Sequence, residues 1–380
     1  MKKIEQFFIE KNHSASTKAH YSCAVKLYEE IAGQSIDDLI DEADAEEEAG
    51  IRWKNRKIKK YLIDFRNFLY GCKSEGTSKQ YLSDIKTIYR HFEIELHDLP
   101  TFNSKQIDKT YEMTYQDVLT KDELIDAFHE ANNVVKCIIL FTSSSGLSKV
   151  DLLNLTVGDF IEACNVKNND LLEQLYDIKS QKDLIPCFIG ERQKTSKRFV
   201  TFCSPEATNY IVQYLIGRDA TIREDYSAGK GAYSSLQYDD KLFDISESHL
   251  SYSLKKINNK LDLGFVGKHR KFKCHAMRKF HATTLLNIKG NAFSVNEIDT
   301  LQGRSMDMTH RAYFHNDKES LLEKYKAHVD ELMLFDGVSK DEYNKVVKEN
   351  NLKQQTLEDQ KKTIDEIIKN QRELEAMLGL

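Results

Sequence analysis

The chain has 380 residues, of which 40% are hydrophobic and 30% charged, a balance typical of a folded protein with more than one core. No apolar run approaches the roughly 18 residues of a membrane helix, and the N-terminus lacks a signal-peptide core, so neither a membrane nor a secreted protein is expected. The formal net charge of −5 argues against a uniformly basic DNA coat, so any nucleic-acid contact needs basic residues concentrated on one surface.

The cysteines and prolines further narrow the class of protein. The seven cysteines are scattered and include no Cys-x-x-Cys pair, which indicates reduced thiols in a cytoplasmic protein rather than disulfides or a zinc site. Only three prolines occur, at positions 100, 186 and 205, which favours a mostly helical chain.

Residues 1–98 are predicted to form a helical domain. Ser14 to Thr17 offer N-caps for a first long helix, and amphipathic helices follow around Leu62 and Ile85. An acidic run at 41–48 precedes a basic stretch that starts at Arg52. Basic residues on such helices either form a solvated face or contact DNA. The candidates for DNA contact in this domain are Arg52, Lys54, Arg56, Lys57, Lys79 and Lys86.

A polar stretch at 99–115 with little periodicity is predicted to be a linker, and a second domain is predicted over 116–335. Thr120 and Glu123 form a capping box that opens a helix, and an apolar run follows from Val134. The sequence then reads Gly-Leu-Ser-Lys-Val-Asp-Leu over residues 146–152. In this motif Ser148 can cap a helix whose third residue is Asp151.

The middle of this domain changes character. Two β-rich runs, 184–189 and 199–202, flank the polar segment 191–198 and predict a hairpin. Ser204 and Pro205 predict a helix start, with the helix running through Tyr214, and the polar residues 217–247 predict a long loop or insertion. A basic cluster before His275 would meet an entering DNA backbone; its candidate contacts are Lys268, Arg270 and Lys271.

The stretch 275–313 carries the candidate chemistry. His275 and Arg278 are three residues apart, so on a helix they share one face and can meet one ligand. Arg304 follows a glycine at a predicted helix end, and Tyr313 follows nine residues later. Two arginines, a histidine and a tyrosine form a candidate anion-binding site with a candidate nucleophile.

The residues His275-x-x-Arg278, Gly303 and a tyrosine ten positions after that glycine resemble the tyrosine recombinase (phage integrase) family. The resemblance implies a mainly α fold with a small β-hairpin: a helical core-binding domain (1–98), a linker (99–115), an α+β catalytic domain (116–335) and a C-terminal helical tail (336–380). It implies site-specific cleavage and rejoining of double-stranded DNA through a 3′-phosphotyrosyl bond, by a homo-tetramer on paired sites. The resemblance implies neither a metal nor another cofactor, and it leaves integration, excision and inversion open.

The site roles also come from the resemblance. Tyr313 would be the nucleophile, and Arg278, His275 and Arg304 would bind the phosphate. A lysine of the hairpin would be the general acid, with Lys194 as first choice and Lys197 as second.

Two positions depart from the family pattern. The first catalytic arginine of Gly-Leu-Arg is Ser148 here, so Lys149 becomes its candidate replacement, as in archaeal-type members, and Arg304 stands where the family has His or Trp. A catalytically impaired relative that only binds DNA is therefore the alternative.

The tail from Asp341 onward has an imperfect heptad pattern. Leu357, Ile364, Gln371 and Leu378 fall seven apart. The pattern fits either a short coiled coil between copies or a single amphipathic helix packed on its own chain. A helical scaffold that recruits partners through this tail is a third reading of the whole protein.

Overall fold

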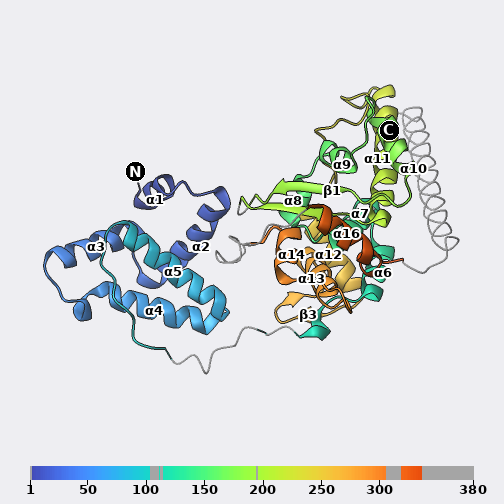
Figure 1. Ribbon diagram of the computed structural model, residues 1–380. Helices are drawn as coiled ribbons and strands as arrows, with labels where there is room; N and C mark the ends of the chain where they lie inside the picture. Colours follow the sequence, from blue (N-terminus) through green and yellow to red (C-terminus); the bar gives the residue numbers. More distant parts are fainter. Residues whose placement is uncertain (1, 103–110, 112–113, 194–195, 305–317, 336–380) are drawn as a thin grey trace, which may run out of the picture. The chain divides into compact units, whose positions relative to one another are not determined.

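The computed structural model describes every residue except 1, 103–110, 112–113, 194–195, 305–317 and 336–380. The described part is mainly helical, with two antiparallel sheets of two strands each, which is the fold class that the sequence predicts (Figure 1). The chain divides into two compact units, Met1–Glu112 and Met113–Leu380. No helix within the described ranges is long and apolar enough to cross a membrane.

The first unit is a helical bundle. Its elements are α1 (Lys3–Glu10), α2 (Ala15–Ala32), α3 (Ile36–Glu48), η1 (Trp53–Asn55), α4 (Lys57–Cys72) and α5 (Glu75–His91). Three of these helices start at a serine, Ser14, Ser35 or Ser74, whose side chain accepts a hydrogen bond from the backbone three residues on. The bundle has its own core, in which the hydroxyl groups of Tyr28 and Tyr89 hydrogen-bond to each other at 3.0 Å.

The chain that leaves this bundle is held against α4. Arg66 donates from Nη1 to the carbonyl of Pro100 at 2.5 Å, and its guanidinium lies 4.9 Å from the ring centre of Phe102. The Phe102 ring also stacks on Tyr70, with 4.8 Å between ring centres. The first residues of the predicted linker are therefore part of the first unit.

The second unit is built around a buried helix. Its first elements are η3 (Tyr115–Asp117), α6 (Lys121–Glu130), α7 (Asn133–Ser145), α8 (Lys149–Asn154), α9 (Val157–Cys164) and α10 (Leu171–Ser180). Every residue of α7 from Val135 to Ser145 is buried, and α7 packs on α6, α11 and α13. A helix that is covered on all sides forms the centre of its domain. The last residues of α7 are therefore held rigidly in the core, next to the candidate site described below.

The predicted hairpin is present, with different limits. It consists of β1 (Cys187–Glu191) and β2 (Arg198–Phe202), with Cys187 opposite Phe202 and Glu191 opposite Arg198. The first strand therefore begins three residues later than the apolar run at Leu184, and both strands extend to the ends of the polar segment. Alternating burial along β2 places Phe199 and Thr201 inside.

Among the remaining elements, two differ from the sequence-based predictions. The remaining elements are α11 (Pro205–Ser227), α12 (Glu247–Lys260), β3 (Phe265–Val266), β4 (His269–Arg270), α13 (Cys274–Leu286), α14 (Val295–Leu301), α16 (Lys318–His328) and η4 (Val329–Glu331). The prediction of a loop from residue 217 is wrong, because α11 continues to Ser227. Its extension carries an Asp219–Arg223 pair at 2.6 Å, and the second oxygen of Asp219 accepts from the backbone of Leu236.

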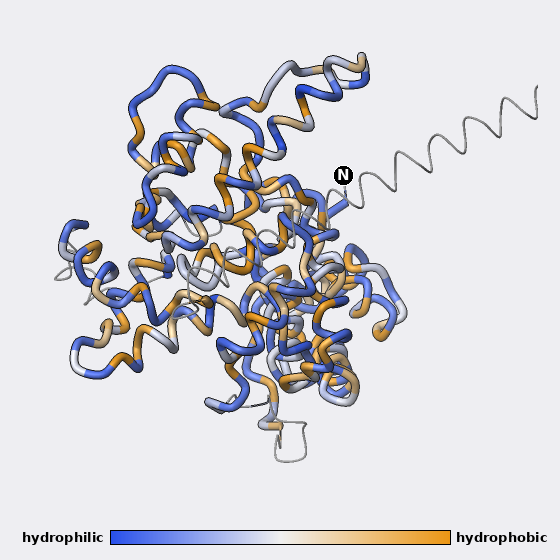
Figure 2. Tube along the Cα trace, turned by 90° about the vertical axis from the view of Figure 1, so that its right-hand side faces the viewer, coloured by the Kyte–Doolittle hydropathy of each residue, from blue (hydrophilic) through white to orange (hydrophobic). Residues whose placement is uncertain are grey.

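The second correction is the β3–β4 hairpin, where the sequence pattern predicted only a basic cluster. Its two-residue turn is Gly267-Lys268, and Gly267 has a positive φ of 59°. Along the helices of Figure 2 hydrophobic and hydrophilic residues alternate at short intervals, which is the pattern of amphipathic helices with one buried side.

Candidate functional site

A basic pocket of about 810 Å³ lies in the second unit, bordered by the start of α8, by α12, by the β3–β4 hairpin and by α13. We call it the cationic pocket. Nine of its sixteen lining residues are lysine or arginine, and among the residues that the structure describes no aspartate or glutamate lines it. It brings together four of the six predicted catalytic residues, Lys149, His275, Arg278 and Arg304. Such a surface favours an anionic ligand.

Arg278 is the most constrained member of the pocket. It lies in α13, is 5% exposed, and donates from Nη1 to the Gly146 carbonyl and from Nη2 to the Gln302 carbonyl, both at 2.6 Å. No carboxylate of the described residues pairs with it. Burial, followed by the nearby charges of Arg304 and Arg192, lowers the pKa of Arg278 to about 9. A buried guanidinium without a carboxylate partner is stabilised by a bound anion.

A layer of buried groups fixes this guanidinium from behind. Gln302 donates from Nε2 to the Arg278 carbonyl and to Nδ1 of His281, each at 3.0 Å. Burial, and then the charges of Arg278 and Arg304, lowers the pKa of His281 to about 3, so this ring is neutral at pH 7. Because Nδ1 accepts from Gln302, the ring proton is on Nε2. Gly146 makes room for the ring, since a Cβ at its position would lie 2.5 Å from Nδ1 of His281.

His275 lines the pocket one helical turn before Arg278, as their spacing predicts. Partial burial and then four surrounding cations lower the pKa of His275 below its ordinary value. In order of effect these cations are Lys279, Lys273, Arg278 and Arg304. An anion in the pocket would oppose their effect, so the protonation of His275 is coupled to ligand binding.

Lys149 is the first residue of α8, behind the N-cap Ser148. The Ser148 hydroxyl lies 2.6 Å from a carboxylate oxygen of Asp151, so it closes the local cap rather than facing a ligand. The Lys149 ammonium lines the pocket and pairs with Glu247 of α12 at 2.7 Å. To bind a phosphate it has to leave or share that carboxylate.

Arg192 also lines the pocket, although the sequence pattern did not predict it. It directly follows β1 and donates from Nη1 to the Gly303 carbonyl at 3.2 Å, while its Nε lies 3.4 Å from Asp151. Its partners are far away in sequence, so no local pattern marks it. Its position in the polar turn could have indicated it, because the resemblance already places a catalytic lysine in that turn.

Several predicted residues lie elsewhere. Lys194 and Tyr313 lie outside the described residues. Lys197 is on the β1–β2 turn, where its carbonyl accepts from the backbone of Arg192 at 2.8 Å. Lys271 is not among the pocket-lining residues and pairs with Glu123 of α6 at 2.6 Å, with its side chain 14% exposed.

The predicted DNA contacts are partly placed in the pocket. Lys268 and Arg270 line it, and the Arg270 guanidinium lies over the ring of Phe265. In the first unit, three of the six candidates are paired with acidic residues. Arg56 is buried and pairs with Glu47, Lys57 pairs with Glu42, and Lys79 pairs with Glu75. Arg52, which directly precedes η1, and Lys54, within η1, are exposed. The pKa of the half-buried Lys86 is lowered by burial and then by Arg90.

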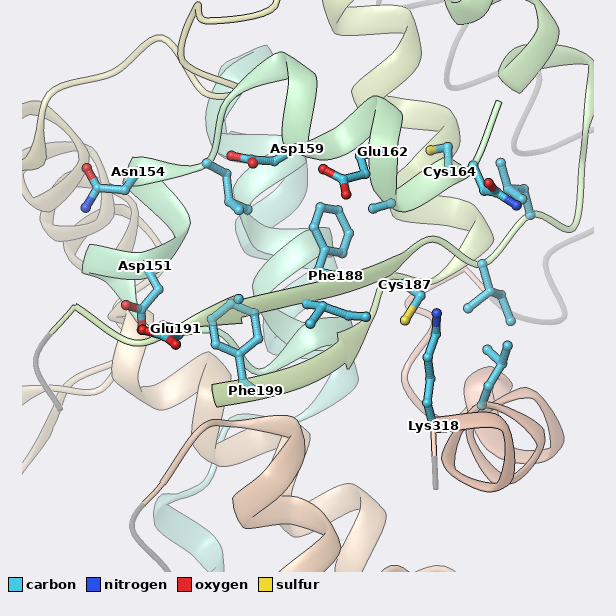
Figure 3. A pocket seen from close by; sticks show the side chains of 18 of the residues that line it. Asp151, Asn154, Asp159, Glu162, Cys164, Cys187, Phe188, Glu191, Phe199 and Lys318 are labelled. Carbon is cyan, nitrogen blue, oxygen red and sulfur yellow. The ribbon is translucent and has the colours of Figure 1, made fainter. Parts of the chain in front are cut away.

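A second pocket, of about 790 Å³, differs in charge (Figure 3). It is lined by Asp151, Asp159, Glu162 and Glu191, with Lys318 as its one cation within the described part of the chain. In Figure 3 the strands β1 and β2 cross this pocket, Asp159 and Glu162 lie on one side of them, and Phe188 and Phe199 project into it. Four carboxylates would repel a phosphate backbone. Of the two pockets, only the cationic one suits nucleic acid.

Comparisons with known proteins gave structural similarities only. No protein-family model and no curated sequence matches the chain. Among solved structures it is similar to a XerA recombinase, with 16% identity, 86% of this chain and 96% of that chain covered, and a TM-score of 0.33. It is similar to a lambda integrase dimer bound to a core site, with 14% identity, 81% and 92% covered, and a TM-score of 0.47. It is also similar to the Tn1549 transposon integrase in complex with transposon right-end DNA, with 15% identity, 86% and 98% covered, and a TM-score of 0.46.

Proposed function

We propose that the chain is a site-specific DNA recombinase of the tyrosine recombinase family, which cleaves and rejoins DNA through a 3′-phosphotyrosyl intermediate. The observation that carries the proposal is Arg278, a buried guanidinium that opens into a pocket lined by cations and has no described carboxylate partner. A phosphodiester is the ligand whose charge this arrangement matches. The order of residues that resembles the family adds the nucleophile.

In the proposed reaction the Tyr313 hydroxyl loses its proton to solvent and its oxygen attacks phosphorus. A new P–O bond forms, and the bond to the 5′-oxygen breaks. Arg278 and Arg304 would hold the non-bridging oxygens, with Lys149 and His275 as further donors, and their charge would stabilise the transition state. The leaving 5′-oxygen takes a proton from a general acid, for which Lys194 is the first candidate and Lys197 the second. Rejoining is the same step in reverse, with a 5′-hydroxyl as the attacking group.

The proposed substrate is double-stranded DNA carrying a recombination site. We assign residues 1–98 to the core-binding domain, because the helical unit presents Arg52 and Lys54 on its surface. A homo-tetramer on paired sites follows from the resemblance. A cytoplasmic location is proposed from the scattered cysteines, and a role of the 336–380 tail in assembly from its heptad pattern together with the resemblance.

The test is a search for the covalent adduct. A pool of random-sequence duplexes, each with a nick that lets a cleaved 5′-end diffuse away, is incubated with the chain, and protein-linked DNA is isolated after denaturation. We expect an adduct whose digested peptide contains phosphorylated Tyr313. Tyr313→Phe should remove it while duplex binding persists, and Tyr233→Phe, at an exposed tyrosine, is the matched control. An adduct that survives in Tyr313→Phe would refute the assignment.

Two observations favour the alternative, a recombinase relative that binds DNA without cleaving it. Position 148 carries no cation, and Lys149 is engaged by Glu247 at 2.7 Å. In that case the wild-type chain would show salt-dependent duplex binding, from the release of counterions, and no adduct under any nick position.

A further inference from the structure

Three arginines converge on one short turn that follows α14. Arg278 donates to the carbonyl of Gln302, Arg192 donates to the carbonyl of Gly303, and Arg304 is the next residue. The arginines come from α13, from the β1–β2 turn and from this turn itself. After burial, the charges of Arg304 and Arg192 contribute to the lowered pKa of Arg278. Like charges gathered around one turn repel each other unless an anion lies among them.

We propose that Arg192 is a direct ligand of the bound phosphate and supplies the arginine that position 148 lacks. The nature of this phosphate, a DNA phosphodiester, rests on the proposed function. The anion site itself rests only on the geometry of the pocket.

The orientation of Arg192 supports this role. Its Nε is directed to Asp151 and its Nη1 to the Gly303 carbonyl, and no hydrogen bond among the described residues uses Nη2. The guanidinium lines the cationic pocket, with its side chain 16% exposed. Two of its nitrogens are thus held by protein groups, and the third can meet an oxyanion without a further ordering cost.

Asp151 explains why the arginine comes from the hairpin rather than from position 148. One oxygen of this buried carboxylate contacts the Ser148 hydroxyl and Arg192, and the other accepts from the backbone of Gln193 at 3.1 Å. The start of α8 therefore holds the hairpin turn through Asp151. Ser148 caps α8, and Arg192 supplies the positive charge. The charge that a Gly-Leu-Arg motif would carry at position 148 thus enters the pocket from the β1–β2 turn.

Gly303 provides independent support for this placement. It has a positive φ of 59°, and a Cβ there would lie 2.7 Å from Cδ and 2.8 Å from Cγ of Arg192. The arginine stem therefore lies directly against the glycine backbone. A longer residue at 303 would displace it from the pocket.

The experiment measures binding of inorganic sulfate by the full chain. NMR titration of His275, assigned with His275→Gln, reports occupancy, because an anion raises the pKa that the surrounding cations lower. We expect Arg192→Ala to weaken sulfate binding roughly tenfold or more, the value of one charge-assisted hydrogen bond. Arg198→Ala is the matched control: it removes the same charge from the same hairpin at a side chain that is 86% exposed, and it should leave binding unchanged.

A purely structural role for Arg192 predicts a different result. Arg192→Ala would then lower the free energy of unfolding while the folded protein bound sulfate as the wild type does, and that outcome overturns the inference. If Arg192→Ala does not fold, Arg192→Gln decides in its place, because it keeps an amide donor and loses the charge. A wild-type chain that does not bind sulfate at His275 also overturns it.

The two proposals fail separately. Sulfate binding that depends on Arg192, together with no covalent DNA adduct, supports the anion ligand and refutes the recombinase. An adduct at Tyr313 that forms equally well in Arg192→Ala, with sulfate binding unchanged, supports the recombinase and refutes the ligand role.

Discussion

Replacing Gly303 with alanine tests the geometry of the site through a residue that carries no charge. Its φ of 59° is in the left-handed region, where a side chain costs about 1–2 kcal/mol. The added Cβ would also meet Arg192 at 2.7 Å and Phe199 at 3.1 Å. Since the arginine side chain is the more flexible neighbour, we expect it to move. Gly303→Ala should therefore lower the free energy of unfolding and weaken sulfate binding about as much as Arg192→Ala does.

Gly264→Ala is the control for backbone strain alone. Gly264 has a similar φ of 72° with nothing within 4 Å of an added Cβ, so this variant should lose about 1–2 kcal/mol of unfolding free energy and bind sulfate normally. Chemical denaturation and the His275 titration supply the two readouts. In an Arg192→Ala background, Gly303→Ala should have no further effect on binding, because the group it displaces is gone. Normal sulfate binding by Gly303→Ala would refute the contact.

Three further predictions concern other parts of the chain. Lys149→Arg should keep or raise DNA cleavage and Lys149→Ala should lose most of it; wild-type cleavage by Lys149→Ala would show a surface lysine paired with Glu247. Sulfate affinity should rise as pH falls through the lowered pKa of His275, because the protonated ring adds a cation. Without sulfate, the free energy of unfolding should fall as pH drops from the ordinary histidine pKa to this lowered one, because the unfolded chain takes up the proton first. Removal of the chain after Ser339 should spare single-site DNA binding and adduct formation but reduce recombinant product; equal product from both chains would leave the tail as local packing.

Local periodicity predicted the parts of the site that depend on neighbouring residues. His275 and Arg278 share a face because they are three apart on α13, and Ser148 caps α8 through Asp151, as its spacing indicates. The hairpin followed from two β-rich runs around a polar turn, although its strands begin and end at other residues.

The parts that the sequence did not reveal depend on distant contacts. Arg192 meets Asp151 and Gly303, which are 41 and 111 residues away in the chain, and no helical or strand period reports such separations. The second half of α11 reads as a loop because its stretch is polar, yet Asp219 holds it to Leu236. From its charge alone, Arg56 is predicted to contact DNA, whereas its side chain is buried against Glu47. Each case is decided by a tertiary partner.

The anchoring of α16 has a consequence for the proposed attack by Tyr313. The buried hydroxyl of Tyr325 donates to the Ser144 carbonyl at the end of α7, so α16 is fixed to the same core that holds Arg278. Tyr313 is covalently linked to Arg304 nine residues before it and to Lys318 five residues after it, both within that unit. At about 3.3–3.6 Å per residue, this separation keeps Tyr313 within roughly 18 Å of Lys318. Attack by the chain's own tyrosine would then be first order, with a rate that dilution of the protein leaves unchanged.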